Sequence, residues 1–315
     1  MSIQPQPLSE QEKKAIVSVC ILAAFADWNQ DEVERAQIER IVNGFSEPHL
    51  DLASTYQDVL GGKLSLTQVV GAQLQSPQTK ALTYEMAVCV CHADGLLKDP
   101  ERQFLTDLRQ ALQLDPSAVD SHHQTAQAIV EQPLASPAPP VIDGNHQELD
   151  QLILNAAILN GALEIMPHSL ATMAIIPLQM RMVYRIGKSY GYELDAGHIK
   201  DFLGTVGIGL TSQVFESFTR RLVGGLTRTV AGGLLGGLAG QAAGSAVAFA
   251  TTYALGQVAK KYYSSARTLT TAQLKEVFSS MLDEARSLQG RYSAQIAQKS
   301  RQVNVSELLP LVRQQ

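Results

Sequence analysis

The spacing of apolar and polar positions predicts helices along the first part of the chain. Ser9 and Glu12 form a capping-box pair ahead of apolar residues at helical spacing, so a helix is expected to begin there. Asp31 and Glu34 repeat the pair, and the helix that they open is expected to end near Gly44.

A strongly apolar helix is predicted at residues 81–93, "ALTYEMAVCVCHA". Turn signals flank it: Ser76-Pro77 precedes it, and Asp99-Pro100 starts the next helix because proline fits the first helical turn. No convincing run of alternating apolar and polar residues, the pattern typical of strands, occurs along the chain. The sequence therefore predicts an all-α fold.

A proline-rich stretch divides the chain into two parts of different character. Residues 131–148, "EQPLASPAPPVIDGNHQE", hold four of the thirteen prolines, and proline prevents a helix from continuing. Acidic residues are dispersed before this stretch, whereas glycine, alanine and leucine dominate after it. We predict a disordered start at 1–8, a helical domain at 9–130, a linker at 131–148, a Gly/Ala-rich hydrophobic helical domain at 149–290 and a tail at 291–315.

Small residues recur every four positions in the second part. Residues 229–259 contain no Asp, Glu, Lys or Arg, and Ala248, Thr252 and Gly256 continue the spacing of an earlier glycine stripe. Four-residue spacing lines small side chains along one helical face, where a second backbone can approach closely. The stripe consists of Gly232, Gly236, Gly240 and Gly244.

Two interpretations of this uncharged run stay open. It forms either a membrane segment, as one span or as a re-entrant hairpin, or a helical hairpin buried within protein. Basic residues flank the run, and tyrosines next to the second flank are typical of a membrane interface. Those flanks are Arg220, Arg221 and Arg228 on one side, and Lys260, Lys261, Tyr262 and Tyr263 on the other.

A basic helical face precedes the uncharged segments. Arg181, Arg185 and Lys188 fall at i, i+4 and i+7, so their side chains share one side of a helix. Such a face contacts anionic lipid head groups, or it is an ordinary solvated or internally paired surface. With Lys260 and Lys261, these three residues are the predicted membrane-surface contacts.

Charge and cysteine content narrow the function classes. A formal net charge of −5 argues against a nucleic-acid partner, since such proteins are usually basic. Three cysteines form no disulfide pattern, which favours a reducing compartment. The polar start "MSIQPQPLSEQEKK" lacks the features of a signal peptide, so the N-terminus is expected to stay cytoplasmic.

Two acidic loops share one skeleton. Ala26-Asp27, six residues and Glu34-Arg35 match Ala93-Asp94, six residues and Glu101-Arg102. Carboxylates of this kind suit a hard cation, so calcium, magnesium or manganese is one interpretation. The other is local: acids cap helices, occupy first helical turns and brace loops. The candidate metal ligands are Asp27, Glu34, Asp94 and Glu101.

Other polar residues are expected to be structural. Cys89 and Cys91, two apart on a helix, point to different faces, and no second Cys or His pair follows at zinc-finger spacing, so these two residues and His92 are predicted to be buried. His122 and His123 lie in a polar stretch and are predicted to be solvated. Neither a phosphate-binding loop nor a common hydrolase motif occurs, and no catalytic residue is predicted.

These motifs resemble two known families. The repeated acidic loop, with Gly95 after Asp94, resembles the TerB-like tellurite-resistance domain over about residues 9–130, although Trp28 replaces the expected glycine in the first copy. That resemblance implies a duplicated helical bundle associated with stress responses and membrane-anchored co-chaperones. Residues 155–263, with "IIPLQMRMVYRIGKSYG", look like a hydrophobic domain of YcjF-type inner-membrane proteins and of some Era-like GTPases.

We therefore expect a non-catalytic bacterial stress-response adaptor. Its TerB-like part would sense or dock, while its Gly/Ala-rich part attaches it to the cytoplasmic face of the inner membrane. Expected partners are membrane lipid and a GTPase or chaperone system in a separate chain, and a homodimer stays open. The alternative is a soluble cytoplasmic stress protein that binds a divalent cation, with its Gly-rich helices as a buried core or an oligomer interface.

Overall fold

The described part of the chain is helical, as the sequence predicts. The computed structural model describes residues 8–27, 32–45, 50–71, 73–94, 97–130, 146–166, 169–223, 241–304 and 308. Within those ranges every regular element is a helix, and no β-strand forms. The all-α prediction is confirmed for them.

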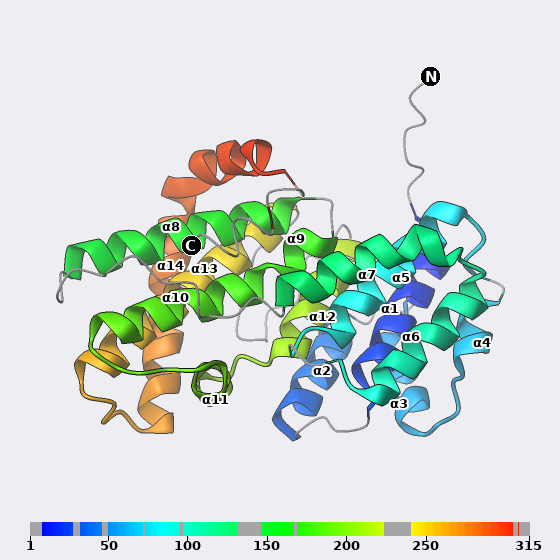
Figure 1. Ribbon diagram of the computed structural model, residues 1–315, viewed down its shortest axis with the longest axis horizontal. Coiled ribbons are helices and arrows are strands. Elements are labelled where there is room, and N and C mark those ends of the chain that lie inside the picture. Colours follow the sequence, from blue (N-terminus) through cyan, green and yellow to red (C-terminus); the bar gives the residue numbers. More distant parts are fainter. Residues whose placement is uncertain are drawn as a thin grey trace.

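The N-terminal helices α1 to α7 lie together at one end of the molecule (Figure 1). Helix α1 packs against α3 and α5, and α5 in turn contacts α6 and α7. In chain order these elements are α1 (Glu10–Ala24), α2 (Glu32–Phe45), α3 (Leu52–Leu60), α4 (Leu66–Val70), α5 (Pro77–Cys91), α6 (Asp99–Leu112) and α7 (Pro116–Val130).

Local capping explains where several of these helices begin. At α1, the Glu12 N–H donates to Ser9 Oγ at 3.2 Å, and the Ser9 N–H donates to Glu12 Oε2 at 2.9 Å. This reciprocal pair satisfies donors that a helix start otherwise leaves unbonded. Helix α5 starts at Pro77, and α6 starts at Asp99 with proline in its first turn. The predicted starts of α1 and α6 are thus confirmed, whereas α5 begins at Pro77, four residues before the predicted start at 81.

The C-terminal helices form the other end of the molecule, with α9 and α12 lying between the two ends (Figure 1). Helix α14 continues to Gln302, so the predicted tail is wrong for its first residues, where buried Ile296 anchors the helix. The elements are α8 (His146–Ile165), α9 (Ser169–Met173), α10 (Ile175–Ser189), α11 (Ala196–Val206), α12 (Leu210–Val223), α13 (Gln241–Ser264) and α14 (Thr271–Gln302).

Helix α13 is the centre of the C-terminal half, where it contacts α8, α10, α12 and α14. Its closest approach to α8 depends on glycine. A Cβ at Gly256 would lie 2.7 Å from Ile153 Cγ1, and a Cβ at Gly161 would lie 3.3 Å from Phe249 Cβ. Since real side chains do not approach so closely at Gly256, only glycine permits this spacing of the two helices.

A polar layer crosses this apolar core. The Asn160 Nδ2 of α8 donates to Thr252 Oγ1 at 3.0 Å, and the Gln179 Nε2 of α10 donates to the same oxygen at 3.1 Å. All three side chains are fully buried. Because a buried donor without an acceptor costs free energy, these hydrogen bonds favour one register of α8, α10 and α13.

The two halves share an apolar cluster. Helix α12 contacts α1, α2 and α5, and its Phe215 and Phe218 are fully buried in a cluster that also contains core residues of those helices. A polar contact adds to this, because Gln37 Nε2 of α2 donates to the Gly207 carbonyl at 2.9 Å. Of the predicted linker, residues 131–145 lie outside the described residues, whereas 146–148 belong to α8.

Candidate functional site

The two acidic loops meet at a lysine. Asp27 follows α1, Asp94 follows α5, and Lys98 immediately precedes α6. The Lys98 Nζ lies 2.5 Å from Asp27 Oδ2 and 3.6 Å from Asp94 Oδ2. The Lys98 ammonium group therefore lies between two of the carboxylates that were predicted as cation ligands.

The second half of the chain reaches the same loop. Lys200 of α11 donates through Nζ to the backbone carbonyl of Asp94 at 2.5 Å. These two residues are 106 positions apart in the chain, so the contact depends on how the halves pack together. The acidic loop after α5 is thus held by one lysine from each half.

Glu101 combines a capping role with burial. Its Oε2 accepts the Lys98 N–H at 2.8 Å in the first turn of α6, as the capping interpretation predicts. The residue is 7% exposed, and loss of hydration, followed by the charges of Asp94 and Asp27, raises its pKa to about 7. Glu101 therefore changes charge near neutral pH.

The geometry gives the metal prediction partial support at most. Asp27, Asp94 and Glu101 come together, whereas the side chain of Glu34 lies outside the described residues. Nowhere in the described ranges do three or more His, Cys, Asp or Glu side chains gather in a way that could hold a metal ion. With Lys98 at the centre, the observed cluster is an ion-pair network of the chain.

The predicted lipid-contacting face of α10 points largely inward. Arg181 is buried and Arg185 is half-buried, and desolvation lowers the pKa of both guanidinium groups. Lys188 is half-buried as well, and its Nζ lies 2.6 Å from Glu193 Oε1. Lys188 thus shows the internal pairing that the sequence left open, whereas the burial of Arg181 and Arg185 was not among the predicted alternatives.

The residues predicted as the second basic flank also differ in whether they are paired or exposed. Lys260 Nζ lies 2.6 Å from Asp150 Oδ1 of α8, whereas Lys261 is exposed. Tyr263, predicted as an interfacial residue, is only 3% exposed, and the Tyr262 ring stacks on Phe202 at 5.2 Å. Both tyrosines thus pack against α11.

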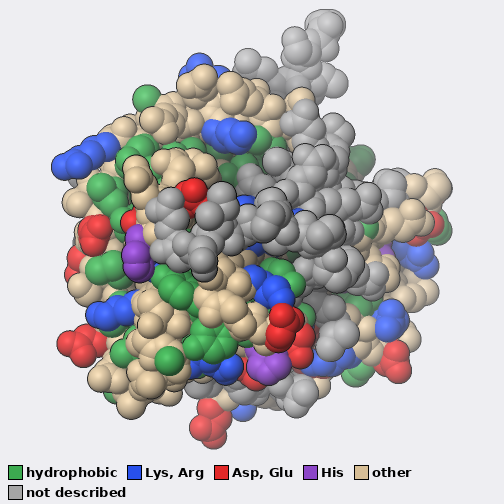
Figure 2. Space-filling view, turned by 60° about the vertical axis from the view of Figure 1, so that its left-hand side comes forward, with side chains coloured by type: hydrophobic (Ala, Val, Ile, Leu, Met, Phe, Trp, Pro, Cys, Tyr) green, Lys and Arg blue, Asp and Glu red, His purple; other side chains and the backbone are tan. Residues whose placement is uncertain are grey.

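Large hydrophobic side chains are rarely fully exposed on the surface of the described residues. Ile165 is the one large hydrophobic side chain among them that is clearly exposed. Figure 2 shows basic and acidic side chains interspersed with hydrophobic ones over the coloured part of the C-terminal face. No helix within the described ranges has the length and apolar character that a membrane span requires.

The glycine stripe is described only at its end. Gly232, Gly236 and Gly240 lie outside the described residues, and Gly244 lies in α13 at a position whose surroundings are not described. Ala248, Thr252 and Gly256, which continue the four-residue spacing, are all buried. This part of the stripe packs within the protein.

The cysteine and histidine predictions have different outcomes. Cys89, Cys91 and His92 are buried as predicted, and burial raises the pKa of both thiols well above the ordinary value. The prediction for the histidine pair is wrong. His123 is half-buried with its ring 5.1 Å from that of His92, and burial lowers the pKa of half-buried His122 to about 4. Both lie on α7, where they face α5.

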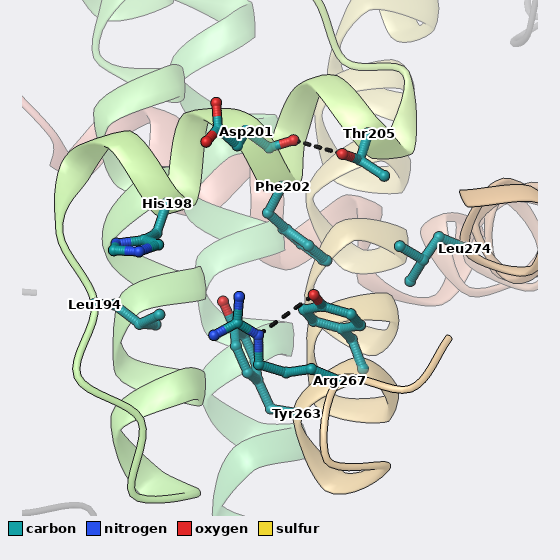
Figure 3. Close-up of a pocket in the computed structure, with 9 residues that line it drawn as sticks. Leu194, His198, Asp201, Phe202, Thr205, Tyr263, Arg267 and Leu274 are labelled. Carbon is teal, nitrogen blue, oxygen red and sulfur yellow. Dashed lines mark hydrogen bonds between the residues drawn. The ribbon is translucent and has the colours of Figure 1, made fainter. Parts of the chain in front are cut away.

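Sequence reasoning missed a cavity of about 120 Å³ between α11, α13 and the start of α14. Phe202, Tyr262 and Leu274 are among the apolar residues that line it, and Arg267 also belongs to the lining. Figure 3 shows Phe202, Arg267 and Leu274 around this cavity. His198 and Asp201 of α11 also line it.

The turn after α13 places Arg267. Ala266 and Arg267 have φ values of 53° and 62°, a left-handed conformation that residues with a Cβ rarely adopt. The guanidinium carbon lies 5.7 Å from the centre of the Tyr192 ring and 5.9 Å from that of Tyr262. Sequence patterns rarely predict consecutive left-handed residues without glycine, so Arg267 gave no recognisable signal beyond its nearness to a tyrosine pair.

The fold and these contacts define an all-α protein in which a helical bundle is joined to a second helical unit around α13. Residues 2–126 match the family described as "Protein of unknown function (DUF533)", so the chain carries a DUF533 domain that includes α1 to α6 and most of α7. No curated protein and no solved structure matches the chain. The family match assigns neither a TerB-like nor a YcjF-type domain.

Proposed function

We propose that this protein is a non-catalytic adaptor of the bacterial stress response. In this proposal its DUF533 domain docks a separate protein, and its second half holds that domain in position. The contacts of the candidate residues support it: Asp27 pairs with Lys98, and Glu101 caps α6. Each serves to hold helices together. The TerB-like resemblance of the same segment is the support for a stress-response role.

This proposal has two forms, which differ in whether the Gly/Ala-rich helices are a protein core or enter lipid. The burial of α13 is the observation that distinguishes them. Ala248, Thr252 and Gly256 are enclosed by protein, and Gly256 lies directly against Ile153 of α8. This favours the form in which the Gly/Ala-rich helices are a protein core over the form in which they enter lipid. Two features support the other form, attachment to the cytoplasmic face of the inner membrane. Lys261 is exposed, and an uncharged run starts at residue 229.

Cell fractionation distinguishes the two forms. The full-length chain is expressed in bacteria, and the membranes are washed with alkaline carbonate next to a known integral protein and a known peripheral one. The core form predicts that the chain leaves the membrane fraction with the peripheral control. Retention alongside the integral control would overturn the core form and favour a hairpin in lipid.

The adaptor role is tested by cross-linking in living cells. Full-length chain with an affinity tag is cross-linked through surface lysines and analysed by mass spectrometry. Cross-links from α1 to α7 to one separate protein, such as a GTPase or a chaperone, are the expected result. A chain that cross-links only to a second copy of itself would contradict docking and indicate a homodimer.

The metal-binding alternative rests on the convergence of Asp27, Asp94 and Glu101, and Lys98 opposes it. Calorimetry with calcium, magnesium and manganese tests it, with Asp94→Asn as the matched variant. We expect no saturable heat at millimolar metal, because the Lys98 ammonium already pairs with Asp27 and Asp94. Saturable heat that Asp94→Asn abolishes would support the divalent-cation alternative.

A further inference from the structure

The cavity beside α11 has the size and walls to hold one planar ring. Its volume is about 120 Å³, and the Phe202 and Tyr262 rings stack at 5.2 Å with 28° between their planes. For comparison, an apolar cavity of about 150 Å³ in another protein binds benzene. Leu194 and Leu274 add to the apolar part of the lining, against which a six-membered ring would replace water. The polar part of the lining comes from His198, Asp201, Thr205 and Arg267.

On its polar side the cavity is lined by the guanidinium of Arg267, an exposed residue whose backbone is fixed by hydrogen bonds of the turn. The Arg267 N–H donates to the Tyr262 carbonyl at 2.9 Å, and Ala266 donates to the Tyr263 carbonyl at 3.2 Å. These hydrogen bonds stabilise two consecutive left-handed residues, a strained arrangement that often occurs at functional positions. The Nε of Arg267 donates to Tyr262 Oη at 3.4 Å. Among the described residues the terminal nitrogens have no hydrogen-bond partner and are available to a ligand.

We propose that this cavity binds a small monoanion built on a single planar ring, with an aromatic carboxylate as the best match. The carboxylate would accept from the terminal nitrogens of Arg267, since a guanidinium fork fits the two oxygens of a carboxylate. The ring would lie against Phe202 and Tyr262. Asp201 also lines the cavity, and its carboxylate would repel any negative charge there. The one positive charge of Arg267 can balance a monoanion but not a dianion, which favours a monoanion.

Isothermal titration calorimetry of the full-length chain with benzoate tests this site. Benzoate is expected to bind saturably, and benzamide, of the same shape but neutral, at least about tenfold more weakly because it lacks the charge-assisted hydrogen bonds. Cyclohexanecarboxylate keeps the charge but not the planar ring, and it is expected to bind more weakly than benzoate.

Arg267→Asn is the decisive variant, because asparagine tolerates the left-handed conformation while removing the guanidinium. It is expected to lower benzoate affinity at least about tenfold with an unchanged circular dichroism spectrum. Arg291→Gln, at an exposed position of α14, is the matched control and should bind benzoate like the wild type. Absence of saturable benzoate binding, or equal affinity in folded Arg267→Asn, would overturn the proposal.

Discussion

Glu101 is a carboxyl group whose proton affinity depends on folding. Its pKa is about 7 in the folded chain and returns to the ordinary value near 4.5 when unfolding exposes it. Between those values the folded state holds more protons than the unfolded state. The stability contribution of Glu101 therefore falls as pH rises from about 4.5 to about 7, and above that range it stays unfavourable.

The variant Glu101→Gln should remove this pH dependence. Glutamine keeps the capping hydrogen bond to the Lys98 N–H but carries no charge. Its free energy of unfolding relative to wild type should rise between pH 5 and pH 8, by about 1 kcal/mol. Urea unfolding across this range measures the difference. Glu276→Gln, on an exposed part of α14, is the control, and the same trend in that variant would contradict the assignment to Glu101.

Lys98 shows what residue patterns could and could not predict. The repeated acids were visible in the sequence, and Lys98 lies four residues after Asp94 and three before Glu101, a spacing that indicates local pairing. Its shorter contact is to Asp27, 71 residues away, and no local pattern reports such a distance. The capping function of Glu101 was predictable because it depends on one helical turn.

At the scale of elements, the interface between α8 and α13 depends on glycine, which has no side chain to separate the two helices. A Cβ at Gly256 would lie 2.7 Å from both Cγ1 and Cγ2 of Ile153, a β-branched residue with little rotamer freedom. Gly290, inside α14, has open space around it, because no atom would lie within 4 Å of a Cβ at this position. The two glycines therefore differ in surroundings while both sit in helices.

We predict opposite effects of alanine at these two positions. Gly256→Ala should destabilise the chain by about 1–2 kcal/mol, because overpacking outweighs the gain in helix propensity. Gly290→Ala should stabilise it by about 0.5–1 kcal/mol through propensity alone. Urea unfolding of both variants measures the two shifts. Stabilisation by Gly256→Ala would mean that α8 and α13 do not approach as closely as described.

Helix starts were easier to predict than helix ends and turns. The starts of α1 and α6 follow from capping residues within four positions, so the sequence indicates them directly. The extension of α14 past residue 290 was missed because its exposed polar residues resemble a loose tail, and its support is tertiary. The turn at Ala266 and Arg267 was missed for the same reason, since other parts of the fold impose its left-handed backbone.

At the scale of the whole molecule, the sequence indicated two compositions but not their shared core. The proline-rich stretch marks where acidic helices give way to Gly/Ala-rich ones. Hydrophobic spacing shows that α1, α5 and α12 each have buried residues, yet it does not show that α12 covers α1 and α5. Such coverage arises from contacts between distant segments, which a single sequence does not report.

Substitutions in the two apolar clusters should show how far the halves unfold together. Phe215 of α12 belongs to the cluster that contains the cores of α1 and α5, whereas Phe278 of α14 belongs to a cluster formed only by C-terminal residues. Phe215→Ala should cost about 3–5 kcal/mol. Hydrogen exchange should then become faster in α1 and α5 as well as in α12, because these helices lose a common partner.

Phe278→Ala is the matched control for this experiment. The same kind of truncation in the C-terminal cluster should accelerate exchange mainly in α11, α13 and α14, since the helices of the DUF533 domain do not contribute to that cluster. If Phe215→Ala left α1 and α5 as protected as in wild type, the shared core would contribute little to the stability of the DUF533 domain. The DUF533 domain would then fold independently, and its stability would not require contacts with α12.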